Sequence, residues 1–131
     1  MFSHVILGVA DFDRALAFYD PVCAALGLTQ SMNGTLLDAR WASWRIAGAP
    51  RPLFAISDPF DGDFVAGNGN MVAFLAPDRA TVDAVHAIGL AHGGTDEGAP
   101  GLRPQYHAHY YGAYLRDPEG NKLAVACHDP V

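Results

Sequence analysis

The residues best suited to chemistry gather near the C-terminal end of the chain. They are Arg103, Tyr106, His107, His109, Tyr110, Tyr111, Tyr114 and His128. Tyrosine offers a flat apolar ring with a phenolic hydrogen-bonding group, and the planar guanidinium of Arg103 could receive a carboxylate or a phosphate. The cluster therefore predicts the wall of a pocket for a planar or amphipathic small molecule. Ordinary strand packing of each tyrosine and a solvated loop position for Arg103 are the alternatives.

A hairpin must position these side chains. Asp117-Pro118-Glu119-Gly120 has the composition of a type I turn, and aromatic and apolar residues flank it on both sides. Side chains alternate along a strand, so the two faces of the hairpin differ. One face carries Tyr110, Gly112, Tyr114, Arg116, Lys122, Ala124, Ala126 and His128. The other face is apolar and suits a covering of helices, whereas the first is predicted to stay open as a cleft.

The two halves of the chain repeat one pattern. The first half has a strand over 3–9, a helix with Asp11 as its N-cap, and strands around 30–35, 40–47 and 52–57. The second half has a strand over 70–76, a helix over 81–91 with Asp78 as its N-cap, a short strand over 95–97, a loop rich in Gly and Pro, and the hairpin. The N-caps Asp11 and Asp78 and the helix-ending Gly27 and Gly94 share an offset of 67 residues. The pattern predicts an α+β fold, one domain of two tandem βαβββ modules, 1–66 and 67–131.

Each predicted module has one helix for four strands. A single helix can cover only one face of a four-stranded sheet. The uncovered faces must either meet each other or form a concave pocket, which is the physical reason to expect a bound ligand.

The segments that carry this pattern resemble the vicinal oxygen chelate superfamily. They are a His in the first strand, the helix sequence ALAFYDPVCAALGL, the sequence GNGNMVAFLAPD at the start of the second module, and the turn sequence DPEGNKL of the C-terminal hairpin. This superfamily includes glyoxalase I, bleomycin-resistance proteins, fosfomycin-resistance enzymes and extradiol dioxygenases. The resemblance covers essentially the whole chain. It implies tandem βαβββ modules that form a cupped mixed sheet with helices on its outer face, often in a homodimer, with a divalent metal held by His and Glu side chains.

The residues that the resemblance places at the metal site match the family at one position of four. The first-strand His falls on His4, the second-module His on Met71, and the two Glu on Ala124 and on or near Phe54. A divalent ion needs about three or four protein ligands, and the side chains of Ala and Phe cannot coordinate. We therefore expect the usual metal site to be absent and no cofactor to be needed. A displaced divalent-metal site, built from His4 with His107, His109 or His128, is the alternative.

Two functions follow from this comparison. The first is a small-molecule-binding protein of bleomycin-resistance type, with ligand contacts from His4, Phe54, Met71, Arg103, Tyr106, His107, Tyr110, Tyr114 and Ala124. The alternative is an enzyme, either a lyase or isomerase or a dioxygenase-like protein, with a rebuilt metal centre or metal-free acid–base chemistry by His4 and Tyr114. The resemblance alone does not choose between them.

Composition excludes several other classes. The chain has 8 Lys and Arg against 14 Asp and Glu, and it has no basic run, which argues against nucleic acid and anionic membranes as partners. None of its apolar runs approaches the roughly 18 residues that cross a bilayer. The N-terminus enters a strand at once and shows no leader sequence, so we expect a cytoplasmic protein. Cys23 and Cys127 are expected to be reduced, buried thiols.

Overall fold

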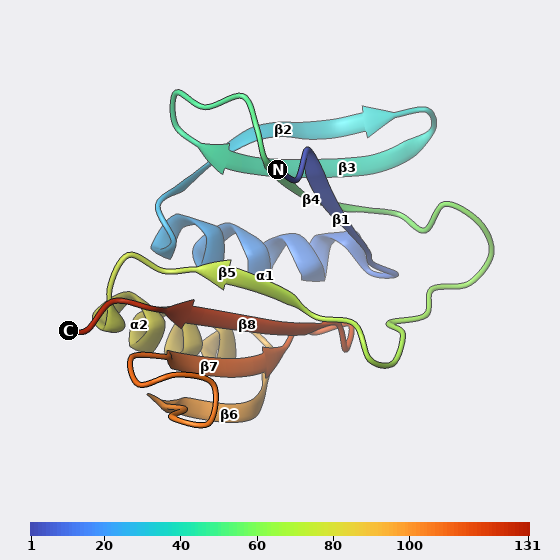
Figure 1. Cartoon of the computed structure of the whole chain (residues 1–131). Helices are drawn as coiled ribbons and strands as arrows, with labels where there is room; N and C mark the ends of the chain where they lie inside the picture. Colours follow the sequence, from blue (N-terminus) through green and yellow to red (C-terminus); the bar gives the residue numbers. More distant parts are fainter.

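The computed structural model describes all 131 residues and consists of two βαβββ units (Figure 1). The first unit contains β1 (His4–Gly8), α1 (Phe12–Ala25), β2 (Leu28–Leu36), β3 (Ala39–Ile46) and β4 (Leu53–Ser57). The second unit contains β5 (Val72–Leu75), α2 (Arg79–Ala91), β6 (Thr95–Leu102), β7 (Tyr111–Arg116) and β8 (Lys122–Cys127). The predicted tandem βαβββ fold is confirmed. Neither helix is long and apolar enough to span a membrane.

Both helices begin where the sequence predicts. The carboxylate of Asp11 accepts the backbone N–H of Arg14 at 3.1 Å, and that of Asp78 accepts the N–H of Thr81 at 2.7 Å. Each aspartate therefore satisfies an N–H group that the first helical turn leaves without a partner. Helix α1 runs through Pro21, which has no N–H to donate to the helix.

The eight strands form two separate four-stranded sheets. Their orders are β1-β4-β3-β2 and β5-β8-β7-β6. In each unit the first strand pairs in parallel with the last one, β1 with β4 and β5 with β8. Helix α1 packs on the first sheet, α2 packs on the second, and the helices pack on each other (Figure 1). The strands of one sheet make no close backbone contact with those of the other. Since both helix-covered faces enclose one shared core, the two uncovered faces point away from each other.

The β7–β8 turn joins the second unit to the first. Asp117 accepts hydrogen bonds from the Tyr19 hydroxyl of α1 and from the backbone N–H groups of Glu119 and Asn121. The carboxylate of Glu119 accepts the N–H groups of Ala10 and Asp11, at 2.9 and 3.1 Å, at the start of α1. The turn therefore holds the helix of one unit against the sheet of the other.

Glu119 should make stability depend on pH. Burial raises the pKa of this carboxyl group, but hydrogen bonds from Ala10, Arg14 and Asp11 outweigh burial and hold the pKa below its ordinary value of 4.5. A carboxyl group whose pKa is lower in the folded than in the unfolded state stabilises the fold fully at a pH above the unfolded-state pKa. This stabilisation is lost as the pH falls through the folded-state pKa. We expect the difference in unfolding free energy between the wild type and Glu119→Gln to be constant near neutral pH and to shrink below about pH 4.5. Denaturant unfolding of both proteins across this range measures it, and a difference that grows on acidification would contradict the assignment.

Two predicted elements differ from the structure. The Gly- and Pro-rich segment after residue 97 continues strand β6 to Leu102, with register shifts at Asp96/Gly98 and Gly98/Gly101. An edge strand tolerates Pro and Gly because one of its sides has no ladder to maintain. His107 and His109 lie in the turn before β7 and not in a strand, so strand alternation does not determine how their side chains are oriented.

Candidate functional site

The uncovered face of the second sheet carries two of the predicted site residues, Tyr114 and Ala124, and other predicted residues lie beside it. We call it the tyrosine face, and it consists of Ala73, Leu75, Gly112, Tyr114, Arg116, Lys122, Ala124 and Ala126. Tyr114 lies opposite Ala124 and Arg116 opposite Lys122 in the β7–β8 ladder. The intervening Ala113, Leu115, Leu123 and Val125 belong to the core. The predicted alternation of the hairpin is therefore confirmed.

Aromatic rings cover one end of this face. The hydroxyl groups of Tyr110 and Tyr114 lie 3.0 Å apart, and the ring of Tyr106 packs edge-on against Tyr110 with centroids 4.9 Å apart. Tyr110 folds over Gly112 so closely that a Cβ at position 112 would lie 2.7 Å from Cε1 of Tyr110. Ala124 is only 1% exposed, so it forms the floor beneath the tyrosines and is not an open wall.

Two cations flank the Tyr114 ring. The guanidinium carbon of Arg103 lies 5.6 Å and Nζ of Lys122 lies 5.9 Å from the ring centroid, both within the range of a cation–π contact. Arg103 is also held against strand β6, since its guanidinium donates to the carbonyl of Ala99 at 2.8 Å. Burial and the hydrogen bond with Tyr110 raise the pKa of Tyr114 above its ordinary value of 10.0. The phenol therefore stays protonated at neutral pH, where it can donate a hydrogen bond but is a poor general base.

His107 and His128 form a hydrogen-bonded pair beside Tyr110. The backbone N–H of His109 donates to Nδ1 of His107 at 3.1 Å, so the proton of that neutral ring must sit on Nε2. Nε2 of His107 lies 2.8 Å from Nδ1 of His128 and donates to it. The two ring planes are inclined to each other by 25°, with centroids 5.1 Å apart, so the rings lie end to end.

The tautomer of His107 can be measured. We expect long-range ¹H–¹⁵N NMR spectra in mildly alkaline solution to show a protonated Nε2 and an unprotonated Nδ1 for His107. The reason is that the amide of His109 occupies the Nδ1 lone pair. A dominant Nδ1–H signal would contradict the hydrogen-bond arrangement around this pair.

The residues at the inferred metal positions do not fit a metal ion. His4 lies exposed on the first sheet, with Nδ1 2.9 Å from the hydroxyl of Ser3, and Met71 precedes β5 on the second sheet. No three His, Cys, Asp or Glu side chains lie close enough together to hold an ion. His107 could coordinate through Nε2 only by moving its proton to Nδ1, where that proton would meet the N–H of His109.

The predicted placement of Phe54 on the open cleft is wrong. Its side chain is 6% exposed and points toward the helices, with its ring 5.2 Å from that of Tyr19. In the β1–β4 ladder the uncovered face carries Ala55, which lies opposite Ile6. Of the other predicted contacts, Arg103, Tyr106, His107, Tyr110, Tyr114 and Ala124 gather at the second sheet, whereas His4 is alone on the first.

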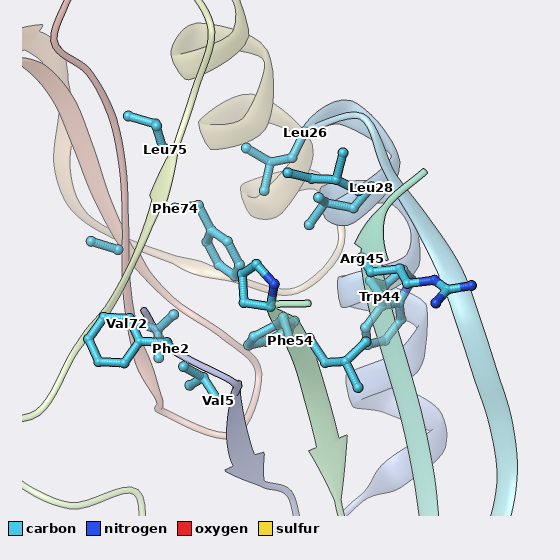
Figure 2. A pocket seen from close by; sticks show the side chains of 14 residues that line it. Phe2, Val5, Leu26, Leu28, Trp44, Arg45, Phe54, Val72, Phe74 and Leu75 are labelled. Carbon is cyan, nitrogen blue, oxygen red and sulfur yellow. The ribbon is translucent and has the colours of Figure 1, made fainter. Parts of the chain in front are cut away.

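Phe54 instead borders an apolar cavity that the sequence did not reveal (Figure 2). The cavity has a volume of about 250 Å³ and lies between β5 and the ends of β1, β3 and β4, beside the C-terminal end of α1. The rings of Phe54 and Phe74 meet there at 4.9 Å (Figure 2). Its walls come from both units, so no pattern within one module could indicate it. Arg45 is the one charged residue that lines it.

Comparison with known proteins agrees with this architecture. The family model described as Glyoxalase/Bleomycin resistance protein/Dioxygenase superfamily matches residues 1–125. A glyoxalase/bleomycin resistance protein from Albidiferax ferrireducens T118 is 36% identical, with a TM-score of 0.83 over 97% of this chain and 98% of that one. A search of curated proteins finds no match to the sequence.

Two more distant structures share the fold. TnmS3, an antibiotic binding protein from Streptomyces sp. CB03234, is 19% identical with a TM-score of 0.70 over 98% of this chain and 96% of that one. A glyoxalase-related enzyme from Fulvimarina pelagi is 16% identical with a TM-score of 0.72 over 100% of this chain and 89% of that one. At these identities the likeness concerns the fold alone. With the family match over residues 1–125, the chain belongs to the glyoxalase/bleomycin resistance protein/dioxygenase superfamily.

Proposed function

We propose that this protein binds a planar or amphipathic small molecule on the tyrosine face, without a metal ion, in a cleft that a second copy of the chain completes. The observation that carries the proposal is the composition of that face. Tyr114 presents a ring and a protonated hydroxyl between the cations of Arg103 and Lys122, on a sheet surface that no helix covers. An aromatic surface with a few polar groups at its edge is typical of small-molecule sites.

A second copy is needed to enclose this site. Within one chain the two uncovered sheet faces point away from each other, so His4 on the first sheet cannot reach the tyrosine face. Strands β1 and β5 each pair with one neighbour only, which leaves two free strand edges. Leu75 is 74% exposed and Phe2 is 66% exposed along these edges. Because unpaired edges with apolar side chains favour association, we propose a homodimer in which β1 of one copy lies beside β5 of the other.

The apolar cavity fits the same arrangement. It opens between the free edges of β1 and β5 of one chain, and Phe2 and Leu75 lie at its border. A partner strand along either edge would cover its mouth and remove these side chains from water. We therefore assign the cavity to the dimer interface and not to the ligand.

Two observations support binding over catalysis. A protein with the same fold, TnmS3, is an antibiotic binding protein, and we propose a comparable binding role for this chain. The enzymatic alternative would use Tyr114 with His4, but the raised pKa of Tyr114 disfavours this tyrosine as a general base. We propose that the protein acts in the cytoplasm, as its sequence predicts.

A thermal-shift screen tests the proposal. The protein would be kept in EDTA and screened against planar aromatic compounds, since a ligand at 100 times its Kd stabilises a protein by about 2.7 kcal/mol. Tyr114→Ala should weaken the binding of each hit by about 10-fold or more, since a stacked ring and a hydrogen bond are both lost. Phe60→Ala, which removes an exposed ring outside the tyrosine face, is the matched control. Compounds that stabilise the protein only when a divalent metal ion replaces EDTA, or hits that bind Tyr114→Ala unchanged, would contradict the proposal.

A further inference from the structure

A second pocket opens at one end of the tyrosine face. Its volume is about 300 Å³, and its walls are the loop from Ala66 to Met71 together with Arg116 and Lys122. Arg116 and Lys122 are direct neighbours at the β7–β8 turn, so both side chains reach the pocket from the same sheet surface that carries Tyr114. In contrast to the apolar cavity of Figure 2, the walls are predominantly polar.

The positive charge in this pocket is only partly neutralised. Nε of Arg116 donates to Glu97 at 2.6 Å and one of its amino groups donates to the carbonyl of Gly120 at 2.8 Å, which leaves the second amino group free. Glu97 is the one acidic residue paired there. Lys122 is the only lysine of the chain, and its ammonium group makes no ion pair and no hydrogen bond. A chain with a net charge of −6 thus keeps an unpaired cation at this place.

The loop adds further donors. The backbone N–H groups from Gly67 to Asn70 donate to no acceptor of the chain. Gly67 and Gly69 have φ angles of +87° and +95°, which residues with a side chain rarely adopt, so the shape of the loop depends on glycine. Asn70 steadies the loop, since its side-chain amide donates to the carbonyl of Ala66 at 3.3 Å. Free amide N–H groups, an ammonium and a guanidinium together form a set of donors that matches an oxyanion.

We propose that this pocket binds an anionic group, a phosphate or a carboxylate, of the small molecule that occupies the tyrosine face; this step rests on the proposed function. Rows of side chains on one face of a strand are about 7 Å apart, so the Arg116–Lys122 row lies one step from the Tyr114–Ala124 row. The ligand is therefore an aromatic molecule with an anionic substituent within roughly 7 Å of its ring. The ring stacks on Tyr114 and the anion enters the pocket.

Titration of ¹⁵N-labelled protein with phenyl phosphate, benzoate, inorganic phosphate and neutral phenol, at constant ionic strength, tests this inference. We expect phenyl phosphate or benzoate to shift the amide signals of Gly67 to Asn70 in a saturable way, and the tighter of the two identifies the preferred anion. Lys122→Gln should weaken this binding by 10-fold or more. Arg51→Gln, which removes the same charge from a loop of the first unit, should change it by less than two-fold.

Two results would overturn the inference: no shift of the loop amides with any of the three anions, or equal affinity of Lys122→Gln and the wild type. The proposed function is tested separately by Tyr114→Ala. If neutral aromatic compounds bind at Tyr114 while the anions leave the loop unmoved, only the anion site is wrong. If the anions bind but phenyl phosphate binds Tyr114→Ala at full affinity, the pocket is an isolated anion site and the proposed function is wrong.

Discussion

Replacement of Asp117 by alanine is expected to lower the free energy of unfolding by roughly 3–5 kcal/mol, because buried donors left without an acceptor cost about 1–3 kcal/mol each. Asp117 is 2% exposed and accepts from the Tyr19 hydroxyl, from the backbone of Glu119, and from the backbone and side chain of Asn121. Its removal leaves these donors unpaired in the region where the two units meet. The sequence DPEGN is therefore more than a turn, since it fastens the second unit to α1.

Equilibrium denaturation in urea measures this effect. Tyr19→Phe removes one of the donors and keeps the ring, so it should cost less, about 1–2 kcal/mol. Burial, followed by the nearby charge and hydrogen bond of Asp117, raises the pKa of Tyr19 well above 10.0, so its hydroxyl remains a donor over the accessible pH range. Asp129→Ala, at an exposed position near the C-terminus, is the control and should change stability by less than about 0.5 kcal/mol. A loss below 1 kcal/mol for Asp117→Ala would show that the turn does not hold the units together.

The second large effect concerns association. Leu75→Glu should weaken self-association at least about 30-fold, the consequence of losing roughly 2 kcal/mol at the centre of an interface. Leu75 is 74% exposed in a single chain, so the substitution should leave the stability of the isolated fold nearly unchanged. Within the proposed dimer, however, it places a carboxylate at the junction of β5 with the partner's β1. Ligand-induced stabilisation should fall with the dimer, since a single chain leaves the tyrosine face open.

Sedimentation equilibrium of both proteins measures the association constant. Leu37→Glu is the matched control, because Leu37 is 93% exposed in the turn between β2 and β3 and belongs to neither β1 nor β5, the strands of the proposed interface. We expect this control to associate like the wild type. A wild type with the mass of a single chain, or a Leu75→Glu variant that still forms dimers, would contradict the shared cleft.

Local patterns in the sequence predicted much of the fold. The two helix N-caps, the repeated order of elements and the alternation along the hairpin all rest on interactions between residues close in sequence. The face that holds Tyr114, Arg116 and Lys122 could be predicted for this reason. The apolar cavity and the bond from Tyr19 to Asp117 could not, since both join residues of different units.

The placement of Phe54 failed for a specific physical reason. The resemblance places a metal-ligand position on or near Phe54, and because the loops before β4 and β8 differ in length, it does not specify a single residue of β4. An error of one residue transfers a side chain to the opposite face of a strand. Phe54 therefore lies in the core, and the uncovered face carries Ala55. Strand β6 was predicted too short, ending at residue 97, because the Gly and Pro residues that follow are typical of loops, although an edge strand accepts them.

The most direct test of metal-free binding on the tyrosine face is an NMR titration of uniformly ¹³C-labelled protein in EDTA with the compound that stabilises it most. We expect saturable shifts of the Ala124 methyl group, which forms the floor beneath the tyrosines and does not line the apolar cavity, and of the Tyr114 ring signals, while the core methyl groups of Ala42 and Ala113 stay unmoved. Shifts confined to Val72, Phe74 and Leu28 around the apolar cavity would place the ligand elsewhere and contradict the account.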